Sequence, residues 1–83
     1  MRLDKFLQVS RLIKRRSLAQ TACHSGRVLL NGRVAKPATP VKIGDRITLC
    51  SASWEVEVQV MALSEKEGGG LFELIRKERR LEE

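Results

Sequence analysis

The spacing of the apolar residues changes abruptly along the chain, from a helical period to a strand period, at Gly26. Before this glycine, apolar residues at positions 3, 6 and 7 and at positions 18, 19, 22 and 23 recur as they do on one face of a helix. After it, Trp54 to Val60 alternates strictly between apolar and polar residues, the pattern of a strand with one buried face. The sequence therefore predicts helices first and a sheet second.

Two short helices are predicted before Gly26. In the first, Asp4 lies in the first turn, where a carboxylate suits the positive end of the helix dipole. In the second, Ser17 and Gln20 have the spacing of a capping box. Gly26 fits the position just past the end of that helix, where a left-handed residue is common.

The remainder predicts a small sheet. Asn31-Gly32 favours a two-residue hairpin turn between residues 27–30 and 33–36. The loop at 37–40 contains two prolines, and strands are expected at 46–49 and 54–60. Residues 71–83 fit either a helix or a strand, and we favour a strand that frays into a charged end. The predicted class is α+β, with two short N-terminal helices packed on a small, mostly antiparallel sheet.

At 83 residues, the chain has room for one domain, expected to span residues 1–83. No apolar run approaches the roughly 20 residues that a membrane helix needs. The first residues lack the apolar region of a secretory signal, so we expect a cytoplasmic protein without membrane contact. Glycines 68–70 indicate a flexible loop over 65–70 and not a phosphate-binding loop, because no Gly-Lys-Ser/Thr follows them.

The positive charge is concentrated in the first half of the chain. Residues 1–46 hold eleven Lys and Arg against two Asp, a net charge of +9, whereas residues 47–83 hold five against eight acids, a net charge of −3. This asymmetry is typical of a protein that meets a polyanion from one side. The densest group is Arg11, Lys14, Arg15 and Arg16, with no acid between Lys5 and Asp45.

The second group of cations, Lys77, Arg79 and Arg80, is expected to be solvated and compensated by the glutamates around it. Arg2 and Lys5 lie off the apolar stripe of the first helix and should face water. Because Arg2 and Arg16 both lie off the apolar stripes, we expect their replacement to change folding by no more than about 0.5 kcal/mol.

Enzyme chemistry is not expected. Cys23 and Cys50 form no Cys-x-x-Cys pair, so both are interpreted as small buried residues, and His24 as a polar residue at a helix end. No nucleophile and base pair or cluster of carboxylates is present, and we expect no catalytic residue, cofactor or metal. The arginine-rich cluster and the absence of tyrosine favour docking on a folded RNA over reading of base sequence.

Several short motifs, in order and at compatible spacings, resemble the RNA-binding domain named after small-subunit ribosomal protein S-four. They are Arg2-Leu3-Asp4-Lys5-Phe6-Leu7, Ser10-Arg11, Arg15-Arg16-Ser17-Leu18-Ala19, Gly26-Arg27-Val28, Asn31-Gly32 and Val41-Lys42-Ile43-Gly44-Asp45-Arg46-Ile47. The match covers about residues 1–50, the core of the αL type of RNA-binding motif, and leaves residues 51–83 for further strand and tail. Within this family, the chain is similar to the free-standing bacterial domains of the ribosome-associated quality control protein P group.

The resemblance implies a function in translation. Members of that group bind large ribosomal subunits that still carry a peptidyl-tRNA after a stalled ribosome has split. They contact the rRNA and the P-site tRNA, and so support the addition of a C-terminal alanine tail by a partner factor. The RNA contacts implied here are Arg2, Lys5, Arg11, Lys14, Arg15 and Arg16. We expect the protein to act as a monomer on this assembly.

Two alternatives remain open at the level of the sequence. One is a heat-shock-type RNA-binding protein that recycles obstructed large subunits, although members of that type carry a long basic C-terminal extension that is missing here. The other, from a different class, is a DNA-binding module.

Overall fold

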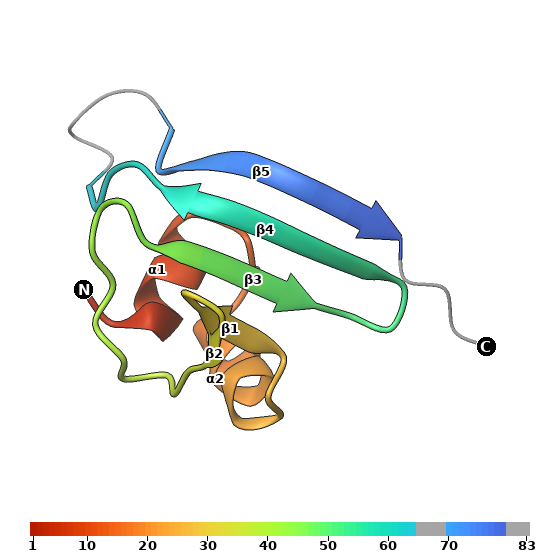
Figure 1. Ribbon diagram of the computed structural model, residues 1–83. Helices are drawn as coiled ribbons and strands as arrows, with labels where there is room; N and C mark the ends of the chain where they lie inside the picture. Colours follow the sequence, from red (N-terminus) through yellow and green to blue (C-terminus); the bar gives the residue numbers. More distant parts are fainter. Residues whose placement is uncertain (65–69, 80–83) are drawn as a thin grey trace.

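The computed structural model describes residues 1–64 and 70–79, and its elements follow the predicted order (Figure 1). Two helices precede five strands: α1 (Leu3–Val9), α2 (Arg16–His24), β1 (Val28–Leu30), β2 (Arg33–Val34), β3 (Arg46–Cys50), β4 (Trp54–Val60) and β5 (Phe72–Arg79). The predicted α+β class is confirmed. The predicted glycine loop lies, apart from Gly70, outside the described residues.

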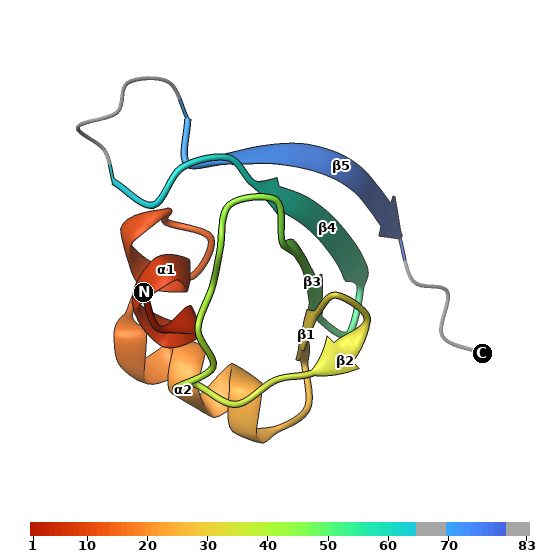
Figure 2. The same cartoon turned by 60° about the vertical axis from the view of Figure 1, so that its left-hand side comes forward.

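The five strands form one antiparallel sheet in the order β2-β1-β3-β4-β5. The sheet curves, and both helices lie on its concave side (Figure 2). Asn31 and Gly32 have φ angles of 52° and 83°, the positive values that the central residues of the predicted tight hairpin turn require. The strand favoured for the end of the chain is confirmed as far as Arg79.

The core fills the space between the helices and the inner face of the sheet. Its fully buried apolar side chains come from both layers: Leu3, Phe6, Leu7, Ala19, Val28, Ile47, Val58 and Val60. The predicted α2 stripe is confirmed at Ala19 and Cys23, but it is wrong at Leu18, which is 52% exposed. Cys50, predicted to be buried, is only half-buried because it ends β3.

The loop between β2 and β3 fixes the start of α1. The Leu3 N–H donates to the Thr39 carbonyl at 2.9 Å, and the Asp4 N–H donates to the Pro37 carbonyl at 3.1 Å. The first N–H groups of a helix have no acceptor within the helix, so the Thr39 and Pro37 carbonyls serve as acceptors for two of them. The loop thereby holds the first turn of α1, and Arg2 just before it, against the body of the protein.

The predicted capping box of α2 is wrong. The helix begins at Arg16, one residue before Ser17, and Arg15 takes the N-cap position without a side-chain hydrogen bond to the helix. Gln20 turns to α1 instead, where its Nε2 donates to Asp4 Oδ2 at 2.9 Å. A buried carboxylate needs donors, and here that need outweighs local capping. The predicted helix end is confirmed, because Gly26 has a φ of 77° and donates its N–H to the Cys23 carbonyl.

A fully buried carboxylate ties the two helices together. Asp4 exposes 0% of its surface, and its oxygens accept hydrogen bonds of 2.8 to 3.4 Å from Gln20, Arg16, Arg2 and the Lys5 N–H. Burial alone raises the pKa of Asp4, but these hydrogen bonds together outweigh it and hold that pKa well below its usual range. The carboxylate is therefore charged in the folded protein, and the packing of α1 on α2 depends on its donors.

Asp4→Asn should remove part of the acid sensitivity of the fold. A carboxyl whose pKa is lowered by folding stabilises the protein above its unfolded-state value of about 3.9, and this contribution is lost as the pH falls below that value towards the folded pKa. Denaturant unfolding should show Asp4→Asn less stable than wild type by about 1–3 kcal/mol at about pH 6, with a smaller difference at about pH 3. Glu73→Gln controls for the loss of one negative charge. A parallel loss of stability in wild type and Asp4→Asn would contradict this role.

Candidate nucleic-acid interface

Two arginines are held on one side by Asp4 and remain open to solvent on the other. Arg2 donates from Nε to Oδ1 at 3.1 Å and from Nη2 to Oδ2 at 3.2 Å. Arg16 donates from Nη2 to Oδ1 at 3.4 Å, and its Nε lies 3.2 Å from Oδ2. The two arginine side chains are nevertheless 50% and 40% exposed. A guanidinium has five N–H donors, so each keeps donors that can reach an anion outside the protein.

This arrangement corrects the expectation that the Arg2 side chain simply faces water. Arg2 and Arg16 belong to one cluster around Asp4, although 14 positions separate them in the sequence. Replacing either with Ala would leave a buried carboxylate short of a donor, which typically costs about 1–3 kcal/mol. We therefore expect each replacement to destabilise the fold by more than the change of about 0.5 kcal/mol expected from the sequence.

The segment between the helices carries three further cations on an apolar anchor. Arg11, Lys14 and Arg15 are exposed, whereas Leu12 and Ile13 between them are partly buried against the core. Arg11 and Lys14 also share the lining of an open pocket of about 690 Å³. The apolar pair therefore holds this segment, which we call the basic loop (residues 11–15), against the core.

Arg11 has an unusual backbone conformation. Its φ of 63° places it in the left-handed region just after α1, where its N–H donates to the Gln8 carbonyl at 3.0 Å. Glycine usually fills this position, because a Cβ costs roughly 1–2 kcal/mol in the left-handed region. The chain thus carries a cation where backbone geometry favours glycine, and strain of this kind gathers at functional sites.

Lys5 completes the six cations implied by the family resemblance. It is exposed on α1, one residue after Asp4, and only its backbone N–H joins the Asp4 cluster. All six residues belong to α1, the residue before it, the basic loop or the start of α2, and these elements lie on the helical side of the sheet (Figure 2). We call this surface the helical basic face (Arg2, Lys5, Arg11, Lys14, Arg15 and Arg16).

The outer face of the sheet neutralises its own charges. Arg76 contacts Glu55 at 2.6 Å, Glu57 at 2.9 Å and Glu78 at 3.2 Å, and Arg46 contacts Glu57 at 3.2 Å. The hydrogen bonds from Arg76 and Arg46 lower the pKa of Glu57, and those to Glu55 and Glu57 raise the pKa of Arg76. A face that pairs its cations in this way offers little attraction to a polyanion.

Lys77 is exposed, as expected, but no glutamate of the described residues contacts it. Its Nζ lies 4.8 Å from the centre of the Trp54 ring, whereas Arg76, which sequence reasoning did not single out, takes the nearby glutamates. Alternation along a strand explains this, since neighbours in sequence point to opposite faces. Arg80 lies outside the described residues.

Within residues 1–64 and 70–79, no three His, Cys, Asp or Glu side chains gather as a metal site would require. Burial raises the pKa of the Cys23 thiol, which disfavours the thiolate that a nucleophile needs. In the same part of the chain, no helix has the length and apolar character to cross a membrane.

Comparison with known proteins identifies the family. The model of the S4 domain family matches residues 1–47. The RQC P-site tRNA stabilizing factors of Halalkalibacterium halodurans and Bacillus subtilis are 45% and 42% identical to this chain, over 94% and 95% of it and 93% and 96% of their own lengths. The trimeric structure of Vibrio cholerae Heat Shock Protein 15 matches with a TM-score of 0.77 at 35% identity, over 89% of this chain and 80% of that one.

These matches confirm the family resemblance drawn from the short motifs and extend it beyond the S4 domain match to nearly the whole chain. They also place the chain among RNA-binding factors that are not enzymes. The chain belongs to the S4 domain family and, within it, to the RQC P-site tRNA stabilizing factors.

Proposed function

We propose that this protein binds large ribosomal subunits obstructed by a peptidyl-tRNA, contacts the rRNA and the P-site tRNA, and supports C-terminal alanine tailing of the stalled chain. The name of its relatives points to a P-site tRNA. The observation that carries the proposal is the Asp4 cluster, where a carboxylate orients two half-exposed guanidinium groups beside an uncompensated basic loop. Arginine groups held in this way suit the phosphates of a folded RNA.

The contacts we propose are the six cations of the helical basic face, namely Arg2, Lys5, Arg11, Lys14, Arg15 and Arg16. We also propose that the protein is cytoplasmic. We further propose that residues 1–83 form one domain, since all five strands belong to one sheet. Finally, we propose that the protein acts as a monomer beside the alanine-tailing factor. Because the related heat-shock protein was seen as a trimer, light scattering of the free protein and of the subunit complex tests this point.

A heat-shock-type role in recycling large subunits is the second candidate, supported by the fold shared with Heat Shock Protein 15. The two functions differ in their consequence for the stalled chain. Deletion of the gene should abolish alanine tails under the first function and leave them intact under the second. A DNA-binding role is tested by comparing duplex DNA, tRNA and large subunits at one salt concentration.

Cosedimentation of the tagged protein should show preference for large subunits that carry peptidyl-tRNA over empty ones. If about four to six of the proposed cations neutralise phosphates, log K should fall with log[salt] at a slope of roughly −3 to −5. A slope near zero, or equal binding to both kinds of subunit, would contradict the proposal.

Arg11→Gly should weaken RNA binding, through loss of the charge, without destabilising the fold. Glycine removes the cation but relieves the left-handed conformation, so the free energy of unfolding should stay the same or rise by up to about 1 kcal/mol. Binding to tRNA-bearing subunits should weaken by about 1–3 kcal/mol, as expected for one charged contact.

Lys36→Gln, in the loop between β2 and β3, is the matched control, because it removes one exposed cation outside the helical basic face. It should leave binding nearly unchanged. If both variants bind equally, Arg11 makes no contact of its own with the RNA.

A further inference from the structure

A small apolar pocket lies behind the basic loop. Its volume is about 290 Å³, and its walls include Leu12 and Ile13 of the loop, Leu49 and Val56 of the sheet, and Trp54. Ligand pockets usually span roughly 300–1,000 Å³, so this one suits a single ring system better than an extended ligand. Leu12 and Ile13 lie between the cations of the basic loop in sequence, so this loop supplies one wall of the pocket.

Trp54 is a half-exposed aromatic ring in the wall of this pocket. It is 42% exposed, so the core does not account for its presence at the start of β4. The Lys77 Nζ lies 4.8 Å from the ring centre, within range of a cation–π contact. This contact restrains the indole and leaves it partly accessible, as a platform for stacking requires.

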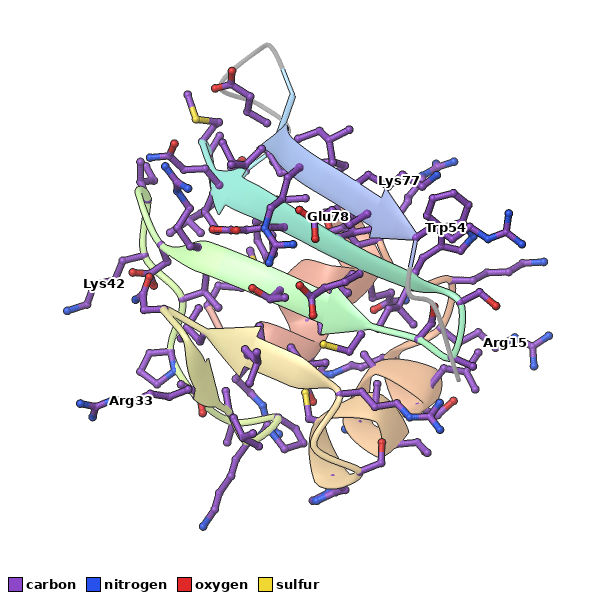
Figure 3. The ribbon with its side chains drawn as sticks, turned by 45° about the vertical axis from the view of Figure 1, so that its right-hand side comes forward. Arg15, Arg33, Lys42, Trp54, Lys77 and Glu78 are labelled. Carbon is purple, nitrogen blue, oxygen red and sulfur yellow. The ribbon has the colours of Figure 1, made fainter. Side chains whose placement is uncertain are left out.

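Cations from three segments of the described chain lie around the pocket. Strand pairing places Val56 opposite Lys77 and Trp54 opposite Arg79, so both cations lie on the helical side of the sheet with Trp54. Arg27 lines the pocket directly. Figure 3 shows Arg15 and Lys77 extending from the same end of the molecule as Trp54.

Among residues 1–64 and 70–79, the acids near this end of the sheet contact a cation on the outer face. Glu55 of β4 lies opposite Glu78 of β5 in the strand register, and the carboxylates of both contact Arg76 on the outer face. The pocket therefore combines an apolar wall and an aromatic ring with surrounding cations. A nucleotide has the complementary features, an aromatic base joined to negatively charged phosphates, whereas an apolar side chain of a protein would gain nothing from the cations.

We propose that the pocket binds one unpaired nucleotide of the RNA, with its base against Trp54 and its flanking phosphates beside Arg15 and Arg27. This inference rests on the proposed RNA binding and adds to it a site that reads an unstacked base. A base stacked on an aromatic side chain is tolerant of sequence, so the pocket selects for an unpaired position in the RNA and not for one base.

Trp54 itself reports on the site, because the chain has one tryptophan and no tyrosine. The full-length protein is titrated with two synthetic RNA hairpins that share a stem, one fully paired and one with a single bulged nucleotide. The anisotropy of a dye on each RNA measures binding independently. Both RNAs should bind, and only the bulged hairpin should quench the fluorescence of Trp54.

Trp54→Ala should weaken binding of the bulged hairpin by on the order of 5- to 150-fold, as expected for the loss of one stacked base. Binding of the paired hairpin should be unchanged. Trp54→Phe, which keeps a ring, should retain most of the affinity. Leu74→Ala is the matched control, since it truncates an exposed apolar side chain of β5 outside the pocket.

If both hairpins bind without quenching, or if Trp54→Ala binds the bulged hairpin as wild type does, the nucleotide site is refuted while RNA binding by the helical basic face stands. A pocket that serves a protein partner would give this result. If neither hairpin binds, RNA binding and the site fail together. Should Trp54→Ala not fold by circular dichroism, the quenching of the wild-type protein decides the question.

Discussion

The carboxylate of Asp4 holds the helical half of the protein together and fixes the direction of two arginines at its surface. It is fully buried, and it is accommodated there because both helices and Arg2 supply donors to it. Two guanidinium groups around one carboxylate leave a local excess of positive charge. Ordering a long side chain at an interface costs roughly 0.5–1.5 kcal/mol, and here folding has already ordered two of them. Folding and RNA binding therefore depend on the same contacts.

The two faces of the sheet differ in how far their cations are paired with acids. On the outer face, Arg76 and Arg46 are paired with glutamates, so this side is close to neutral. On the helical side, the basic loop has no acid nearby in sequence, and the buried Asp4 faces its own arginines. The net charge of +6 thus understates how strongly one side of the protein attracts a polyanion.

The order of the elements was predictable because it depends on local chemistry. Three predictions rest on neighbouring residues alone, and each is confirmed: helices before strands, a hairpin turn at Asn31-Gly32 and a helix end at Gly26. The capping box failed because Gln20 found a partner in another helix. A signal for that partner was available, since Asp4 is the only acid in the first 44 residues and is surrounded in sequence by cations.

The surroundings of Trp54 could not be predicted in the same way. Lys77 stands between an arginine and a glutamate in sequence, a pattern that predicts compensation by glutamates. Which face a strand residue occupies depends on the register between β4 and β5, and this register shifts between Glu57 and Val58. Sequence alone does not fix such a shift.

The most direct test of the account is the affinity of Asp4→Asn for large subunits that carry peptidyl-tRNA, measured beside Glu73→Gln with folding checked by circular dichroism. Both variants lose one negative charge, so an interaction governed by net charge alone would tighten in both. If Asp4 positions Arg2 and Arg16, Asp4→Asn should instead bind roughly 5- to 30-fold more weakly while Glu73→Gln does not. Binding by folded Asp4→Asn that equals or exceeds that of wild type would contradict the account.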